Sequence, residues 1–84
     1  YWMGLGTALQ MCGELDGAMQ AYEMASILED SDPTPYFYLA KCLLEMNNRE
    51  ATLQALDICI EYCQDLLEFQ ELKDQAIEAK KILL

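Results

Sequence analysis

Apolar residues recur at intervals of three and four along most of this 84-residue chain, which is the spacing of amphipathic helices. The first such stretch covers residues 1–11 and is followed by Gly13, a residue that readily takes the positive φ at which helices end. A second stretch follows after a very short turn, with Asp16 as its expected cap. Its apolar stripe consists of Ala18, Met19, Tyr22, Ala25 and Leu28. The pattern predicts an antiparallel helical hairpin over residues 1–30.

Residues 29–35, EDSDPTP, are the clearest break in the pattern. Thr34 precedes a proline and is therefore pushed out of helical geometry, so we expect Thr34 to be a cap and Pro35 the first helical residue. A third and a fourth helix follow, joined at residues 47–48, where asparagine tolerates the left-handed turn. They form a second hairpin over residues 34–64. The inner face of its second helix should carry Leu53, Leu56, Cys59, Ile60 and Cys63.

Residues 66–84 read as one further helix with a single apolar stripe. The stripe consists of Phe69, Leu72, Ala76, Ala79 and Leu83. A stack of hairpins exposes the apolar side of its last member unless something covers it. We therefore expect this helix to cap the second hairpin.

The two hairpins repeat one another at a distance of about 34 residues, the period of tetratricopeptide (TPR) repeats. The corresponding pairs are Trp2 and Tyr36, Leu5 and Leu39, Gly6 and Ala40, Leu9 and Leu43, Glu14 and Asn48, Ala25 and Cys59, and Ile27 and Glu61. Only the last pair changes its chemical type. Two helices cross closely where a side chain is nearly absent, so Gly6 is expected to face Ala18. The sequence thus predicts one all-α domain over residues 1–84, with two TPR hairpins and a capping helix.

The charge balance narrows the range of partners. Fifteen acidic residues against five basic ones, with no histidine, leave a net charge of −10. Such a chain repels phosphate backbones and anionic lipid surfaces, so neither nucleic acid nor a membrane is an expected partner. The sequence also has no apolar run long enough to span a bilayer.

The cysteines, Cys12, Cys42, Cys59 and Cys63, fall at helical positions. We interpret them as small buried apolar residues of a reducing cytoplasm, carrying free thiols. Two alternatives stay open: a pair of disulfides, and a thiolate zinc site in which Cys59 and Cys63 share one helix face.

The sequence contains no recognisable catalytic constellation, phosphate-binding glycine loop or serine elbow, so we expect neither an enzyme nor a cofactor or metal. The remaining candidate site is the face of each hairpin's first helix that points away from its partner, because these faces line the concave side of a TPR stack. The candidate peptide-binding residues are Met3, Gly4, Thr7, Gln10, Met11, Phe37, Tyr38, Lys41 and Leu44, with Glu45 beside them.

Tyr36, Phe37 and Tyr38 are three successive aromatic residues, which at about 100° per residue cannot all point into one core. If Tyr36 takes the core position of Trp2, the other two turn toward the groove, where they either bind a ligand or pack on an adjoining repeat. Met3 and Met11 add flexible apolar surface that suits extended peptides of variable sequence. Because Lys41 is the only base in this set, a clamp for a C-terminal carboxylate is disfavoured.

Several segments together resemble the class II chaperones of type III secretion, which hold translocator proteins. The segments are residues 1–6 (YWMGLG), 9–11 (LQM), 18–22 (AMQAY) and 35–38 (PYFY), with Ala40 and Cys42. The resemblance spans roughly residues 1–65 and implies a cupped TPR domain in the bacterial cytoplasm whose concave groove holds an extended translocator segment. A homodimer is a possible partner, because self-association would cover apolar surface that a missing upstream repeat leaves exposed. The family's N-terminal helix and first repeat have no counterpart here, so a longer natural chain is expected.

The chain departs from the family at residues 47–49, NNR, where a glycine, an acid and an aromatic residue are more usual, and in its number of cysteines. The main alternative function is a generic TPR scaffold for protein interaction or self-association. A thiol or metal protein is a weaker alternative.

Overall fold

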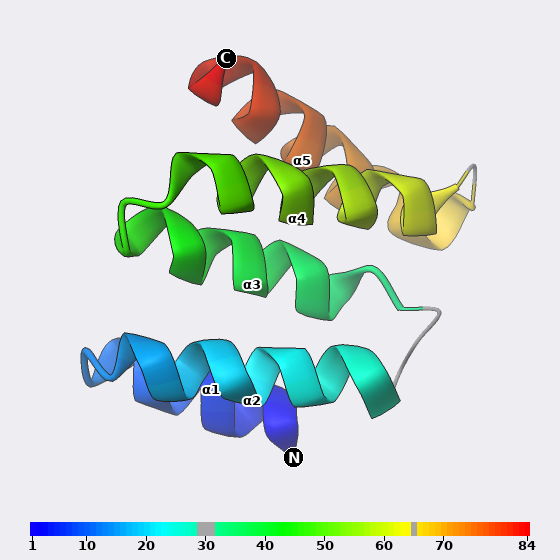
Figure 1. Cartoon of the computed structure of the whole chain (residues 1–84). Coiled ribbons are helices and arrows are strands. Elements are labelled where there is room, and N and C mark those ends of the chain that lie inside the picture. The colour runs from blue at the N-terminus through cyan, green and yellow to red at the C-terminus, as the bar shows by residue number, and fades with distance from the viewer. Residues whose placement is uncertain (29–31, 65) are drawn as a thin grey trace.

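The computed structural model describes residues 1–28, 32–64 and 66–84, and the secondary structure of these residues is helical (Figure 1). The elements are α1 (Trp2–Met11), α2 (Leu15–Leu28), α3 (Thr34–Glu45), α4 (Arg49–Cys63), the short 3₁₀ helix η1 (Leu67–Phe69) and α5 (Gln70–Leu83). Helices α1 and α2 form one hairpin and α3 and α4 form a second, which stacks on the first through contacts between α2 and α3. Helix α5 packs on α4 and reaches α3, so the two predicted hairpins and the predicted capping helix are present. The all-α fold prediction is confirmed.

The first helix of each hairpin ends in the same hydrogen-bonded turn, one repeat apart. Gly13 has φ of +84° and Asn47 has φ of +63°, as the sequence predicts for both turns. In the first turn the N–H of Glu14 donates to Leu9 O at 2.9 Å, and in the second the N–H of Asn48 donates to Leu43 O at 3.0 Å. Each bond satisfies a carbonyl that the helix end would leave unpaired. The Asn48 side chain then accepts a hydrogen bond from Ala51 N at 3.1 Å and caps α4.

Two predicted helix starts are wrong by one or two positions. Asp16 lies inside the first turn of α2, which begins at Leu15, so its carboxylate complements the helix dipole from within. Thr34 is already the first residue of α3, and its N–H donates to Asp32 Oδ1 at 2.9 Å. The hydrogen-bond acceptor at the start of α3 is therefore the Asp32 carboxylate. It pairs with the main-chain N–H of Thr34, the residue that precedes Pro35. Residues 29–31 of the predicted break lie outside the described residues.

The close approach of α1 and α2 is made by Gly6 and Tyr22 instead of by Gly6 and Ala18. A Cβ atom added to Gly6 would lie 2.6 Å from Tyr22 Cε1 and 2.8 Å from Cδ1, which is closer than such atoms can approach. Ala18 is buried with Tyr22 and Cys42 in the core between the hairpins. The prediction had the correct small residue and the wrong partner, because the flat Tyr22 ring fills the space at the crossing.

The remaining core lies between the second hairpin and α5. Its buried members are Ala40, Leu43, Ala55, Leu56, Cys59, Cys63 and Ala76. The other predicted stripe residues of α5, Phe69, Leu72, Ala79 and Leu83, pack against this core while partly exposed. The segment starts with the 3₁₀ helix η1, which the sequence pattern does not distinguish from the α-helix that follows. At the other end of α5, Lys80 forms an ion pair with Asp57 of α4.

All four cysteines are free thiols, and Cys42, Cys59 and Cys63 are buried as predicted. The prediction is wrong for Cys12, which is exposed and follows the last residue of α1. Burial raises the pKa of the Cys59 thiol to about 12 and also raises the pKa values of Cys42 and Cys63. These three thiols are therefore neutral at physiological pH. Across the described part of the chain, no three Cys, Asp or Glu side chains are placed to hold a metal ion together.

Within the described ranges, no helix has the length and apolar character that crossing a membrane requires.

Candidate peptide-binding groove

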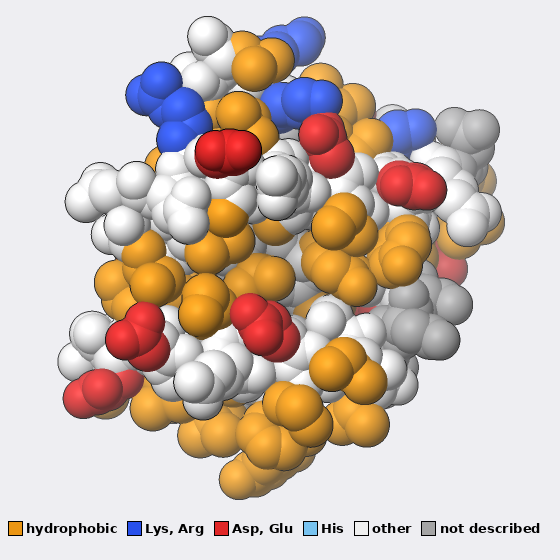
Figure 2. Space-filling model, in the orientation of Figure 1, with side chains coloured by type: hydrophobic (Ala, Val, Ile, Leu, Met, Phe, Trp, Pro, Cys, Tyr) orange, Lys and Arg blue, Asp and Glu red, His pale blue; other side chains and the backbone are white. Residues whose placement is uncertain are grey.

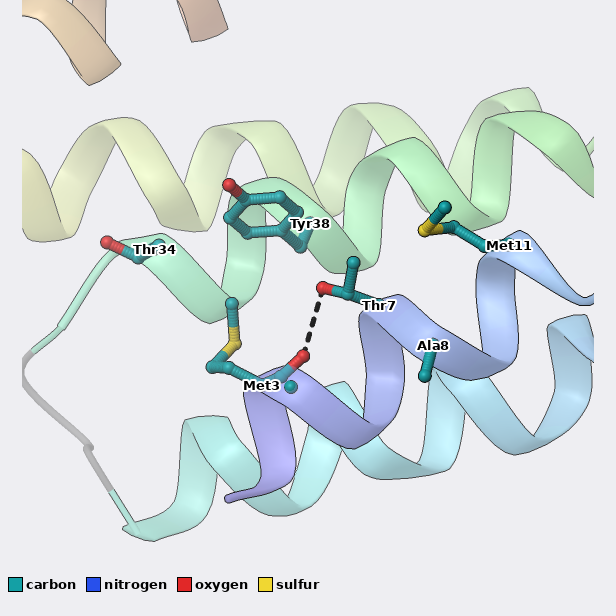
Figure 3. A pocket seen from close by; sticks show the side chains of 7 residues that line it. Met3, Thr7, Ala8, Met11, Thr34 and Tyr38 are labelled. Carbon is teal, nitrogen blue, oxygen red and sulfur yellow. Dashed lines mark hydrogen bonds between the residues drawn. The ribbon is translucent and has the colours of Figure 1, made fainter.

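The first pocket of the candidate site lies between α1 and α3 and has a volume of about 580 Å³. We call it the methionine pocket; its lining residues are Met3, Gly4, Thr7, Ala8, Met11, Thr34 and Tyr38. Figure 3 shows Met3, Thr7, Ala8 and Met11 along α1, with Thr34 and Tyr38 on the facing helix α3 and the Met3 and Thr7 side chains directed toward α3. The Thr7 hydroxyl donates to Met3 O at 3.0 Å, so it is engaged by its own helix and the wall is largely apolar. A Cβ added to Gly4 would meet nothing within 4 Å, which leaves this wall open opposite Tyr38.

A second pocket continues the first toward the other end of α1 and shares Thr7, Met11 and Tyr38 with it. We call it the tyrosine pocket, of about 260 Å³, lined by Thr7, Gln10, Met11, Tyr22, Tyr38, Lys41 and Glu45. Tyr22 comes from α2 and supplies the floor. Its hydroxyl donates to Gln10 Oε1 at 2.8 Å, which ties the floor to α1.

The third pocket lies between α3, α4 and α5 and has a volume of about 210 Å³. Its wall is apolar, and we call it the apolar pocket; it is lined by Phe37, Ala40, Lys41, Leu44, Thr52, Leu56, Ala79 and Leu83. It shares Lys41 with the tyrosine pocket, so the three pockets follow one another along α1, α3 and α5 through shared lining residues, and we call them together the groove.

The apolar pocket repeats the geometry of the first two with different chemistry. One repeat length of about 34 residues takes Met3 to Phe37 and Gln10 to Leu44 in the walls. The same step takes Tyr22 to Leu56 in the floor. The first repeat therefore has an amide at Gln10 and a hydroxyl at Tyr22. At the corresponding positions the second repeat has only the hydrocarbon side chains of Leu44 and Leu56.

Phe37 and Tyr38 line the groove and also pack against the cores of the hairpins. The Tyr38 ring stacks on the Tyr22 ring with centroids 5.9 Å apart and an angle of 26°, and both residues border the core of the first hairpin. Phe37 packs against the core of the second hairpin and meets Tyr38 edge to face at 6.1 Å. The Lys41 ammonium lies 5.6 Å from the Phe37 ring centroid and 5.4 Å from that of Tyr38. Tyr38 therefore packs on the adjoining repeat, whereas the ligand-binding role of both side chains stays a prediction.

All the candidate residues named from the sequence line one of these pockets, but the structure does not test whether they bind a ligand. The additional lining residues are Ala8, Tyr22, Thr34, Ala40, Thr52, Leu56, Ala79 and Leu83. Ala8 could have been predicted from the sequence as a lining residue, because it follows Gly4 by one helical turn and so lies on the same helix face. Ala79 stands one repeat after Glu45, so extending the repeat count into α5 would have found it. Tyr22 could not have been predicted in this way, because the apolar pattern assigns it to the core and does not show where its hydroxyl lies.

The groove is nearly uncharged although the chain carries a large negative charge. Lys41 and Glu45 are the only charged residues that line its three pockets in the described part of the chain. The other described acidic residues do not line it, and Figure 2 shows several acidic side chains on the face formed by α2, α3 and α4, with basic side chains gathered toward α5. That face has its own pocket of about 360 Å³ between α2 and α4, and Figure 2 shows hydrophobic side chains on it as well. Its lining residues are Met19, Glu23, Tyr36, Leu39, Leu43, Asn48, Ala51, Gln54, Ala55 and Ile58. Both faces thus offer apolar surface, and the groove is the one that the predicted candidate residues line.

Comparison with known proteins agrees with this geometry. A family model described as "Tetratricopeptide repeat" matches residues 1–32. The low calcium response locus protein H of Yersinia pestis is 30% identical over 87 aligned residues, which cover 96% of this chain and 52% of that protein. The chain thus spans about half the length of the curated relatives that it matches.

Two solved structures of SycD, a type III secretion translocator chaperone of Yersinia enterocolitica, superpose on the chain with TM-scores of 0.92. One is a complex with a peptide of the translocator YopD, at 24% identity, covering 98% of this chain and 63% of SycD. The other is an alternative dimer, at 26% identity, covering 98% and 62%. The predicted resemblance is confirmed: the chain has a tetratricopeptide-repeat fold and is similar in sequence and structure to the type III secretion translocator chaperones.

Proposed function

We propose that the chain is a non-enzymatic secretion chaperone domain that binds an extended apolar segment of a type III translocator protein in the concave groove. The observation that carries this proposal is the run of three connected pockets along α1, α3 and α5, with apolar walls in an otherwise acidic protein. The complex of SycD with a YopD peptide supports it, since SycD shares this fold. We place this activity in the bacterial cytoplasm, before export of the client.

Binding protects the client by removing apolar side chains from water. Burial of apolar surface contributes about 25 cal/mol per Å², so a few anchoring side chains hold a segment that would otherwise aggregate. Each pocket holds a few side chains at most, and adjacent pockets share residues. This arrangement suits an extended strand that presents successive side chains to the groove. Release for export then needs only dissociation and no covalent step.

The pockets have different expected occupants. Phe37 and Leu44 enclose a small apolar pocket that fits one branched aliphatic side chain. Met3 and Met11 border a wider one, and Met11 is 84% exposed, so its flexible thioether side chain can adapt to different residues. Lys41 and Glu45 stand between these two regions and allow a polar or charged client residue there.

An array of overlapping peptides from translocator proteins, YopD included, tests the proposal. We expect the complete protein to retain apolar peptides of extended character and to ignore scrambled sequences of equal composition. Leu44→Asp should abolish retention by placing a charge in the apolar pocket. Leu67→Asp is the matched control, because Leu67 is 89% exposed and lines none of these pockets.

A protein that retains no translocator peptide but forms dimers in sedimentation experiments would support the self-association alternative. The homodimer itself is compatible with both functions, as the alternative dimer of SycD indicates for that protein. Peptide retention that survives Leu44→Asp but is lost with Ile58→Asp would move the site to the pocket between α2 and α4.

A further inference from the structure

The Tyr22 hydroxyl is a polar group at the floor of the tyrosine pocket. The residue as a whole has 0% of its surface exposed, yet its hydroxyl borders the tyrosine pocket and donates to Gln10 Oε1 at 2.8 Å. Thr7 Oγ1 is more distant from the hydroxyl, at 3.4 Å, and its own proton is donated to Met3 O. The single Tyr22 proton is thus directed to the oxygen end of the Gln10 carboxamide.

This bond orients the Gln10 side chain. A carboxamide has its oxygen and its NH₂ group on opposite edges, so fixing the oxygen on Tyr22 leaves both N–H donors for the rest of the tyrosine pocket. The Gln10 nitrogen has no hydrogen-bond partner among the described residues. An extended peptide presents main-chain carbonyl groups that need such donors once water is excluded.

We propose that Gln10 donates a hydrogen bond to a main-chain carbonyl of the bound segment, and that Tyr22 is a positioning residue that holds the Gln10 amide in this orientation. The inference rests on the proposed function and assigns the polar part of that site. A hydrogen bond to the main chain does not depend on the side chains of the client. It therefore suits a chaperone that binds extended segments of different sequence.

Three features keep the Tyr22 hydroxyl in place. The missing side chain of Gly6 lets the ring lie against α1, close enough for the hydroxyl to reach Gln10. The Tyr38 ring stacks on it from α3. Burial raises the pKa of Tyr22, so the hydroxyl remains a protonated donor at physiological pH.

The second repeat provides an internal contrast. Leu44 and Leu56 stand where the first repeat has Gln10 and Tyr22, so the equivalent hydroxyl and amide are absent there. The main chain of the client is therefore held at the tyrosine pocket, whereas the apolar pocket holds a side chain.

The test uses a fluorescently labelled peptide with the YopD sequence retained most strongly on the array, titrated with the complete protein. Gln10→Leu and Tyr22→Phe should each weaken binding about fivefold, the usual contribution of one hydrogen bond. Both substitutions affect the proposed hydrogen bond from Gln10 to the peptide: Gln10→Leu removes it and Tyr22→Phe removes the group that orients it. The double variant should therefore bind no more weakly than Gln10→Leu alone. Tyr36→Phe removes a hydroxyl outside the groove and should leave the affinity unchanged.

A second cycle changes the peptide instead of the protein. Replacing its amide bonds one at a time by esters weakens the carbonyl acceptor, and one such ester should reduce affinity for the wild type but not for Gln10→Leu. Thermal melting shows whether Tyr22→Phe folds. If it folds poorly, this cycle still tests the hydrogen bond between Gln10 and the peptide, because it does not use that variant.

Wild-type affinity in both single variants, with the peptide still bound, would overturn the inference and leave the proposed function standing. Additive losses in the double variant would show that Tyr22 does not act through Gln10. Failure of the wild type to bind any translocator peptide would refute the proposed function, and with it this inference.

Discussion

The ring of Tyr22 lies so close to Gly6 that a single added carbon would come within 2.6 Å of it. This contact brings α1 and α2 together and also places the Tyr22 hydroxyl at the floor of the groove. One glycine therefore affects both the stability of the hairpin and the form of the candidate site.

The first prediction compares two glycines of the same helix. Gly6→Ala should lower the free energy of unfolding by about 1–3 kcal/mol, and Gly6→Leu by more, because neither backbone nor buried ring has room to move. Gly4→Ala should raise it by roughly 0.5–1 kcal/mol, since alanine favours the helix and its Cβ would meet nothing within 4 Å. Urea denaturation of the variants measures both. Equal effects at the two positions would show that the crossing is not at Gly6.

The second prediction concerns the groove side chains. Phe37→Ala and Met3→Ala should each weaken binding of the YopD peptide roughly tenfold or more, as truncation of an anchoring side chain commonly does. Tyr38→Ala should weaken it as well and also cost about 1 kcal/mol of stability, because it removes the stacking on Tyr22. Peptide titration beside thermal melts separates the two effects. Unchanged affinity with a large loss of stability would place these residues in the core only.

The third prediction concerns the thiols. In the folded protein, a water-soluble thiol reagent should modify Cys12 within minutes and leave the other three cysteines unmodified, since they are buried. After denaturation without reductant, all four should react. A shortfall of two thiols, with a mass lower by two hydrogens, would indicate a disulfide instead.

The fourth prediction concerns alkaline pH. A thiol whose pKa is higher in the folded state than in the unfolded state contributes stability that is complete below its unfolded pKa and is lost as pH rises toward the folded value. For Cys59, the free energy of unfolding should therefore fall between about pH 9 and about pH 12. Cys59→Ala should reduce this slope, and Cys12→Ala, at an exposed position, should not. Identical slopes in both variants would exclude Cys59 as the cause.

The fifth prediction separates two contacts of α5. Ala76→Leu should destabilise the protein by about 1–3 kcal/mol, because Ala76 is completely buried against the second hairpin. Lys80→Met should change stability by less than about 1 kcal/mol, since its ion pair with Asp57 is exposed to solvent. Hydrogen exchange of α5 checks both. A greater loss of protection in Lys80→Met than in Ala76→Leu would show that the ion pair, and not the buried contact of Ala76, holds α5 in place.

Local interactions account for what the sequence by itself determined. The turns at Gly13 and Asn47 depend on the φ preference of one residue and on carbonyls within the same helix, so they can be predicted without knowledge of the fold. The repeat period likewise identifies the hairpins and brings the candidate residues of α1 and α3 to one face. The family resemblance rests on the same kind of information, since it is carried by short contiguous segments.

Contacts between distant residues decided the rest. The choice of Tyr22 over Ala18 as the neighbour of Gly6 depends on how the ring fits between two helices, which helical spacing does not specify. The hydroxyl of Tyr22 looked like part of a core residue, and only the crossing of α1 and α2 brings it to Gln10. The apolar pocket also needs α5, because Ala79 and Leu83 close a wall that the hairpins alone leave open. Shape complementarity between helices thus decides the chemistry of the groove, whereas local propensity decides where its helices begin and end.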